Sequence, residues 1–333
     1  MTMSESYLVT GGLGCIGAET TRWLLNNTTG KVVVCGRDVN LQRVERVLHH
    51  VDRTNLKVLA LDITNQPLLA NTIQEEGISH VIHLAALQTP DCNEHRNLGM
   101  QINLGGTQNL LEAMKCHRSQ IKRFVFASSI AVYGPRAFYP TGGVPLDATP
   151  HPVNVYGAWK LAGENITRIF SEETGIASIS LRPGVLFGPG RDAGLTSTPT
   201  TALKSVALGI PYEIPFQNNQ DYLYAPDVGA AFGHATTEPF TGYSAFTLPS
   251  HTVETAQFVS AITKAAEATG IASQCNITVG KQTVPFICDL AYDSFQDAFP
   301  NVPHTQLNLA VQSSLRTFQE QVKNGWLRSE MIH

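Results

Sequence analysis

The sequence predicts an α/β protein with a doubly wound parallel sheet and a smaller C-terminal lobe. Short β-branched runs alternate with longer amphipathic stretches through the first half, a glycine-rich turn follows the first run, and the composition changes after about residue 184. Repeated strand–helix alternation is typical of a parallel sheet with right-handed crossovers. We therefore expect one domain over residues 1–183 and a second lobe over 184–333, from which some segments return to the first domain.

Six apolar runs bounded by turn residues are expected to form buried strands. They are residues 7–10, 31–35, 57–61, 80–85, 123–128 and 178–182. Five further stretches show helical periodicity: 18–26, 41–50, 67–76, 103–117 and 155–174. Pro67 at a helix start and Gly175 after a helix end are typical of helix boundaries.

The second half of the sequence has a different composition. Residues 184–194 and 196–201 are rich in Gly, Pro, Thr and Ser, and helices are expected near 252–269 and 307–325. The sequence therefore predicts a smaller lobe that closes over the first domain and binds substrate.

Composition excludes several classes of function. The 333 residues carry a formal charge of -4 and no dense Lys/Arg run, which argues against a nucleic-acid partner. No apolar stretch approaches the roughly 18 residues that span a bilayer, so we expect no membrane segment. The first strand begins near Tyr7, which leaves no room for a signal peptide. Six cysteines without CxxC spacing indicate reduced thiols in a cytoplasmic protein.

No metal site is expected either. His95, His151 and His234 show no spacing typical of metal ligands.

The glycine-rich turn predicts a nucleotide site. Gly11, Gly14 and Gly17 allow a tight turn, close approach of the backbone to a pyrophosphate, and close packing of helix on sheet. The helix that begins at Cys15 and Ile16 points its free N–H groups at the phosphates. The first domain is therefore predicted to be a Rossmann-type dinucleotide-binding domain.

The end of the second strand bears on which dinucleotide binds. Gly36 stands where an NAD-selective site needs an acidic residue, and Arg37 follows it. Since a guanidinium can grip a 2′-phosphate, we expect NADP to be preferred, with NAD as the alternative through Asp38. Two further segments are expected to line the cofactor. Asp62 and Ile63 would flank the adenine, and Leu84, Ala85 and Ala86 would leave space beside the nicotinamide.

A phenol and an ammonium share one helical face. Tyr156 and Lys160 are four residues apart, so the lysine can approach both the tyrosine ring and the cofactor ribose. Because a free phenol has a pKa near ~10, a neighbouring ammonium and the oxidised nicotinamide are expected to lower it. Ser129, at the end of the fifth strand, can hydrogen-bond the carbonyl or hydroxyl that reacts.

These motifs together resemble the extended short-chain dehydrogenases/reductases, the NAD-dependent epimerase/dehydratase family. The matching segments are TGGLGCIG at 10–17, LDI at 61–63, HLAA at 83–86, NLGGT at 103–107, FASSIAVYG at 126–134, YGAWK at 156–160, LRPGVLFGPG at 181–190 and DYLYAPDV at 221–228. The resemblance implies Ser129, Tyr156 and Lys160 as the catalytic triad, Asn103 near the site, and Pro183 touching the cofactor through its backbone. It also implies a homodimer formed by the helices at 103–117 and 155–174.

Two departures from the family pattern concern the substrate. Val185 stands where sugar-nucleotide epimerases usually have a substrate-binding Asn, and Gln220 replaces an Arg that pairs with the diphosphate. Loss of that charged hydrogen bond would weaken diphosphate binding by roughly 1.5–3 kcal/mol. Arg191 is a candidate substrate residue that, with Lys204, would supply a compensating charge. Tyr133 is expected either to line the pocket or to pack.

The leading hypothesis is an NAD(P)-dependent oxidoreductase, a dehydrogenase or carbonyl reductase. Tyr156 would act as acid and base on a small sugar, sugar acid, polyol or hydroxy acid. The alternative is an NAD-dependent sugar or nucleotide-sugar epimerase that keeps its cofactor bound. A non-catalytic sensor is disfavoured because such proteins typically lose the tyrosine or the lysine, and both are present.

Overall fold

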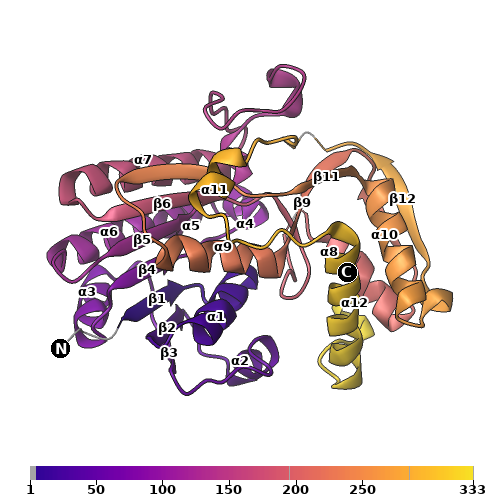
Figure 1. Cartoon of the computed structure of the whole chain (residues 1–333), viewed down its shortest axis with the longest axis horizontal. Helices are drawn as coiled ribbons and strands as arrows, with labels where there is room; N and C mark the ends of the chain where they lie inside the picture. Colours follow the sequence, from indigo (N-terminus) through magenta and orange to yellow (C-terminus); the bar gives the residue numbers. More distant parts are fainter. Residues whose placement is uncertain (1–4, 195, 285, 333) are drawn as a thin grey trace.

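The computed structural model describes residues 5–194, 196–284 and 286–332, and the predicted fold class is confirmed. Within these ranges, seven parallel strands form the central sheet, in the order β10-β6-β5-β4-β1-β2-β3 (Figure 1). Their bounds are β1 (Ser6–Thr10), β2 (Lys31–Gly36), β3 (Leu56–Ala60), β4 (His80–His83), β5 (Arg123–Ala127), β6 (Ala177–Arg182) and β10 (Tyr243–Thr247). The first six lie where the apolar runs predicted strands, because buried parallel strands are apolar on both faces.

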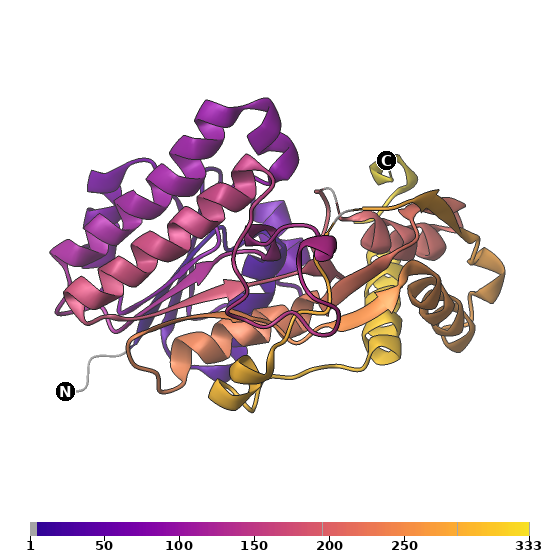
Figure 2. The same cartoon turned by 90° about the horizontal axis from the view of Figure 1, so that it is seen from above.

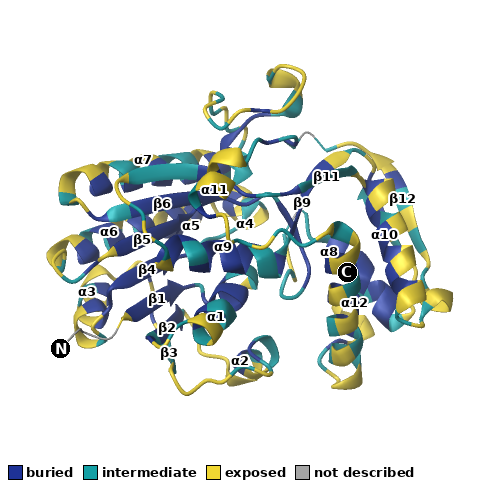
Figure 3. Ribbon diagram, in the orientation of Figure 1, coloured by how far each residue is buried: buried dark blue, intermediate teal, exposed yellow. Residues whose placement is uncertain are grey.

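Helices cover both faces of this sheet, as Figure 2 shows from above. One face carries α1 (Cys15–Asn27), α9 (Ala225–Thr237) and α11 (Asp293–Ala298). The other carries α3 (Gln66–Glu75), α6 (Gly106–Cys116) and α7 (Val155–Thr174). The short helices α2 (Leu41–Val47), α4 (Thr89–Glu94) and α5 (Arg96–Met100) lie in the connections. The burial pattern in Figure 3 fits these layers, with buried strands and helices exposed on their outer sides.

The C-terminal lobe has its own apolar core. One small sheet holds β7 (Val185–Phe187), β9 (Asn219–Tyr224) and β11 (His251–Glu254), and a second pairs β8 (Tyr212–Phe216) with β12 (Ile277–Gln282). Three helices pack with them: α8 (Thr198–Leu208), α10 (Thr255–Ala268) and α12 (Leu307–Lys323). Phe187, Phe258 and Phe318 are buried at the centre of this cluster.

Segments of the second half also complete the first domain. β10 pairs in parallel with β6, from Tyr243 opposite Ser178 to Thr247 opposite Arg182. Helix α9 lies so close to α1 that a Cβ atom on Gly233 would stand 2.1 Å from the Trp23 ring. These returns agree with the expectation that the second half is not one continuous lobe. The division at residue 183 itself stays a prediction.

Other sequence-based expectations remain open. In the described part of the chain, no helix combines the length and apolar character needed to cross a membrane. The expected absence of a signal peptide concerns the residues before Tyr7, of which 1–4 lie outside the described ranges. The cytoplasmic location and the homodimer also stay predictions.

A buried ion pair joins helix α7 to strand β6. Arg182 donates two hydrogen bonds of 2.7 Å to the two oxygens of Glu164, and both side chains are less than 10 % exposed. Ser128 donates to the same carboxylate at 2.5 Å, and Arg182 also donates to the Tyr133 hydroxyl at 2.6 Å. The bidentate geometry and these extra hydrogen bonds offset the desolvation of both charges.

Replacing one partner of this pair is expected to destabilise the whole chain. In Glu164→Gln the buried guanidinium loses its counter-charge, which should lower the free energy of unfolding by about 3–5 kcal/mol. Urea denaturation followed by circular dichroism measures this loss. The matched control is Lys115→Met, which breaks the exposed Lys115–Glu173 pair between α6 and α7 and should leave the midpoint unchanged. Equal midpoints for both variants would contradict the structural role of Glu164.

Candidate active site

A cavity of about 410 Å³ opens at the carboxyl ends of the central strands, between the sheet and the C-terminal lobe. It lies beside β1 and β4, where the strand order changes direction, and ligands of open α/β sheets bind at such switch points. The sequence-predicted residues that line it are Gly11, Gly14, Cys15, Ile16, Gly17, Leu84, Ala85, Ala86, Ser129, Tyr133, Tyr156, Lys160, Pro183 and Arg191. The structure thus brings most of the predicted site together.

The glycine-rich turn forms a floor that only glycine permits at two points. Gly11 has a φ of 66°, and a Cβ on it would lie 2.9 Å from the backbone nitrogen of Ala85. A Cβ on Gly17 would lie 2.2 Å from the Gly11 carbonyl oxygen. Helix α1 begins here with no side-chain cap and no acidic residue in its first turn. Its free N–H groups therefore suit an anion such as a pyrophosphate, and the cradle fits a dinucleotide.

The three catalytic candidates come from two elements that meet at the cavity. Ser129 follows β5, and its hydroxyl accepts from the Ala131 N–H at 3.1 Å. Tyr156 and Lys160 lie on the first turns of α7, where Asn154 caps the helix by accepting from the Gly157 N–H. The Lys160 nitrogen donates to the Ala127 carbonyl at 2.6 Å and lies 5.6 Å from the centre of the Tyr156 ring.

Burial is the largest influence on the pKa values of Lys160 and Tyr156. Desolvation lowers the pKa of Lys160 to about 8. Desolvation also raises the pKa of Tyr156, while a hydrogen bond from Ser129 and the charge of Arg191 oppose that rise. The sequence-based expectation was a pKa lowered by the Lys160 ammonium and the oxidised nicotinamide, whereas in the structure desolvation outweighs the opposing influences and the pKa of Tyr156 is raised. With its raised pKa, the phenol is protonated at neutral pH and is ready to act as an acid.

Arg191 brings a positive charge to the cavity from the loop after β7. Its guanidinium donates to the Gln88 side chain at 3.2 Å and to Thr196 at 3.1 Å, and both partners are neutral. Its Nε is buried without a hydrogen-bond partner among the described residues. The arrangement leaves a partly buried cation able to bind an anionic group.

Four of the predicted cofactor residues lie away from this cavity. Arg37 is exposed beyond the end of β2, and Asp62 is exposed and accepts from the N–H and hydroxyl of Thr64. Ile63 is buried against Gly106. Asn103 is buried in a π-helical turn before α6, where it bonds the N–H and the carbonyl of Leu87. Asn103 thus holds the loop that follows β4.

The polar groups of Tyr133 and His83 form hydrogen bonds with other protein groups. The Tyr133 hydroxyl donates to the Leu146 carbonyl at 3.0 Å and accepts from Arg182, while its ring still lines the cavity. Its predicted contact with substrate therefore stays a prediction for the ring alone. His83 is buried between the hydroxyls of Thr10 and Thr107, and burial lowers its pKa to about 3. This neutral side chain ties strands to α6, in keeping with a structural role.

The far wall of the cavity was missed by the sequence reasoning. Phe286 and Ile287 line it, about 130 residues after Tyr156. Asp221 holds this segment, because its buried carboxylate accepts the backbone N–H groups of Asp289 and Leu290 at 3.0 and 3.2 Å. No local sequence pattern marks such a long-range wall. Gln88, the partner of Arg191, was missed for the same reason.

Comparison with known proteins places these features in context. The UDP-glucuronate 4-epimerase 1 of Arabidopsis thaliana is 32% identical over 195 residues, which are 55% of this chain and 43% of that protein. A UDP-glucose 4-epimerase of Schizosaccharomyces pombe is 35% identical over 214 residues, which are 62% of this chain and 56% of that protein. The chain therefore spans about half the length of the curated relatives that it matches.

Solved structures share the fold over nearly the whole chain. A UDP-glucuronic acid 4-epimerase from Bacillus cereus, in complex with UDP-glucuronic acid and NAD, superposes with a TM-score of 0.76 at 21% identity. The match covers 95% of this chain and 99% of that structure. The sequence profile of the NAD dependent epimerase/dehydratase family matches residues 7–247. The resemblance drawn from the motifs is thereby confirmed, and the chain belongs to the NAD dependent epimerase/dehydratase family.

Proposed function

We propose that this chain is an NAD-dependent epimerase that inverts one hydroxyl-bearing carbon of a sugar carrying an anionic group. The observation that carries the proposal is the convergence of Ser129, Tyr156 and Lys160 on a cavity floored by the glycine-rich turn. The names of the relatives, which are 4-epimerases of UDP-sugars, support epimerisation over net oxidation or reduction. The alternative from the sequence thus fits better than the leading hypothesis did.

Each residue has a distinct part in such a reaction. A bound oxidised nicotinamide would bring a positive charge that favours the phenolate of Tyr156. As phenolate, Tyr156 would take the proton from the sugar hydroxyl while the carbon gives up its hydride, and would return that proton once the hydride has been added to the opposite face of the ketone. Ser129 hydrogen-bonds both the phenol and the reacting oxygen. Lys160 would hold the cofactor ribose and keep a positive charge beneath the tyrosine. The bound nicotinamide would supply the hydride acceptor and donor.

The cofactor in this proposal is NAD. The sequence-based preference for NADP gains no support, because the solved epimerases of similar fold from Thermus thermophilus and Bacillus cereus hold NAD. Arg37, the residue on which the preference rested, is exposed, and no hydrogen bond or ion pair holds it among the described residues. Asp38 beside it is the acidic side chain nearest in sequence to the expected ribose position.

Arg191 is proposed to select the substrate. A sugar's carboxylate or diphosphate would give this cation the anionic partner that Gln88 and Thr196 do not provide. Gln220, the replacement for the diphosphate-binding arginine, is fully buried and does not line the cavity. In this proposal the loop after β7, which carries Arg191, supplies the positive charge for the anion.

A dehydrogenase is the second candidate, and Val185 favours it. This buried valine lines the cavity at the place where sugar-nucleotide epimerases usually carry an asparagine. An apolar wall there suits a smaller substrate without a nucleotide.

One experiment separates the two candidates. The purified protein is incubated with UDP-glucose and with UDP-glucuronic acid, and the sugar is followed by proton NMR while absorbance is read at the reduced-nicotinamide band. An epimerase forms the 4-epimer with no net change in absorbance. A stoichiometric absorbance change with a sugar, polyol or hydroxy acid would make the dehydrogenase the correct assignment.

Tyr156→Phe tests the proton transfer. Removing the phenol oxygen should lower kcat by about 10²–10⁴-fold, because no other acid replaces it, while cofactor binding persists. NMR turnover and the content of bound nucleotide are measured on the same preparation. Tyr212→Phe, on β8 outside the cavity, is the matched control. A Tyr156→Phe enzyme as fast as the control would remove Tyr156 from the mechanism.

Arg191→Met tests anion recognition. Loss of a charged hydrogen bond should raise KM for the anionic sugar by about 10- to 100-fold. Lys204→Met is the control, since Lys204 pairs with Asp192 at 2.8 Å and does not line the cavity. If both variants raise KM equally, the effect is a general loss of positive field and Arg191 does not touch the substrate.

Lys160 predicts how stability depends on pH. The folded chain releases the Lys160 proton near pH 8, whereas an unfolded lysine holds it to about pH 10.4. Between these values the unfolded state binds more protons, so stability rises with pH, by at most about 1.4 kcal/mol per pH unit. Lys160→Met should lack this rise. Urea midpoints of both proteins from pH 7.5 to about 9.5 give the comparison, and parallel curves would refute a buried charge at this position.

A further inference from the structure

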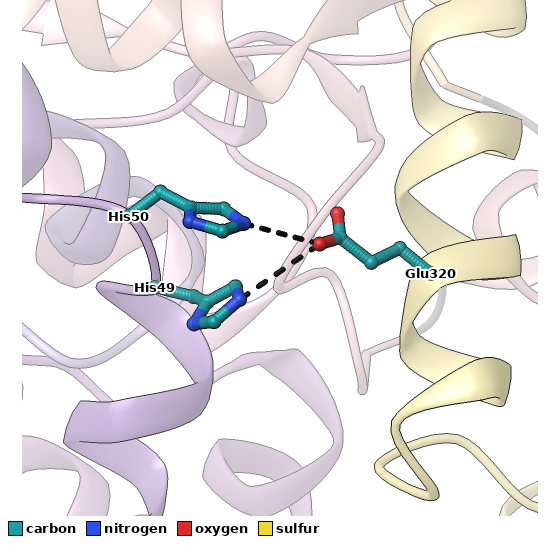
Figure 4. Close-up of side chains that lie close together, drawn as sticks. All are labelled: His49, His50 and Glu320. Atoms are coloured by element: carbon teal, nitrogen blue, oxygen red, sulfur yellow. Dashed lines mark hydrogen bonds and ion pairs between the residues drawn. The ribbon is translucent and has the colours of Figure 1, made fainter.

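Two histidines after α2 and a glutamate on α12 converge where the first domain meets the C-terminal lobe. Figure 4 shows both imidazole rings pointing at one carboxylate oxygen of Glu320. The Nε2 atoms of His50 and His49 lie 3.1 Å and 3.8 Å from that Oε1. Among the described residues, this is the one group of three or more His, Cys, Asp or Glu side chains whose ligand atoms lie within 4.8 Å of one another.

The backbone that presents the two histidines is held in place. Arg22 on α1 donates to the carbonyls of Val47 and His49, where α2 ends. The His49 ring packs edge-on against Trp326, with ring centres 4.8 Å apart. The imidazole of His49 is therefore oriented before any ligand arrives.

A second carboxylate lies behind His49. The His49 Nδ1 lies 4.0 Å from one carboxylate oxygen of Glu45, and Arg53 holds the other oxygen of that carboxylate at 2.7 Å. A carboxylate on the far side of an imidazole is the usual outer partner of a metal-binding histidine.

The spacing suits a first-row transition metal. Zn²⁺ binds His nitrogen at about 2.0–2.1 Å and carboxylate oxygen at about 2.0–2.2 Å, which places tetrahedral ligands about 3.3 Å apart. The observed separations need only small rotations of side chains that are partly free, since the His50 side chain is 72% exposed and that of Glu320 48%. Imidazole ligands disfavour Mg²⁺ and Ca²⁺.

We propose that His49, His50 and Glu320 bind one Zn²⁺-type ion that clips α2 to α12, with the fourth position open to solvent. This proposal departs from the sequence-based expectation of no metal site, which could not pair His50 with a residue 270 positions away. Arg43 on α2 donates to the Leu13 carbonyl in the glycine-rich turn at 2.7 Å, and α12 belongs to the core of the C-terminal lobe. The metal would thus join the nucleotide side of the cavity to the lobe that closes it.

Metal binding is tested directly on the full chain without an affinity tag. Cys116 is exposed, so Cys116→Ser is introduced throughout to remove a competing thiol. Calorimetric titration with ZnCl₂ should show one ion per chain. His50→Gln and Glu320→Gln should each weaken binding at least tenfold, and Glu45→Gln by about tenfold through its partner histidine.

His95→Gln is the matched control, because His95 faces Glu94 in an exposed pair on another surface. Its affinity for Zn²⁺ should equal that of the parent. The proposal is wrong if the parent protein gives no binding heat, or if Zn²⁺ binds unchanged in both His50→Gln and Glu320→Gln. The two substitutions lie on separate elements, and circular dichroism verifies folding of each.

Cobalt and hydrogen exchange test the ligands and the clip. Co²⁺ should give a visible band without a sulfur charge-transfer band, and should quench the fluorescence of Trp326 beside His49. Zn²⁺ should slow hydrogen exchange in both residues 47–51 and α12 of the parent, and in neither segment of His50→Gln. A sulfur charge-transfer band would show that a cysteine binds the metal and would overturn the proposed site. Slower exchange in only one of the two segments would overturn the proposal that the metal joins them.

Discussion

The bidentate contact between Glu164 and Arg182 is the constraint on which the catalytic geometry depends. Two charges removed from water are stable only when every oxygen and N–H has a partner, and here Ser128 and Tyr133 complete the set. The contact joins three neighbouring parts of the site: the helix with Tyr156 and Lys160, the end of the strand before Ser129, and the strand that leads to Pro183. A shift of any one would break a buried charge interaction.

Local patterns were enough to predict the first six strands and to bring Ser129, Tyr156 and Lys160 to one cavity. Buried parallel strands are short apolar runs, and the spacing of Tyr156 and Lys160 follows from the period of a helix, so neither needs knowledge of distant contacts. The glycine-rich turn is recognised from its own spacing, although the space that requires Gly11 is set by the distant backbone of Ala85. The family resemblance added Pro183, which lines the cavity and whose carbonyl accepts a hydrogen bond from the Ile130 N–H.

What escaped prediction depends on contacts between distant segments. Strand β10 is a weak pattern of mixed residues, and only its pairing with β6 makes it a strand. Phe286 and Ile287 reach the cavity because Asp221 holds the following backbone. The raised pKa of Tyr156 also follows from burial, which the spacing to Lys160 does not encode. Arg37 shows the limit of a motif at a strand end: it is exposed and does not line the cavity, so the preference for NADP that rested on it gains no support.

The late return of β10 has a consequence for synthesis of the protein. When the ribosome has released only the first 183 residues, β6 has an unpaired edge, and α1 alone covers the sheet face that α9 and α11 later share. About sixty residues that build the small β7–β9 sheet must emerge before the edge is closed. Vectorial folding therefore cannot finish one domain before starting the other, and the nascent chain passes through a stage with an open, apolar sheet that invites chaperone binding.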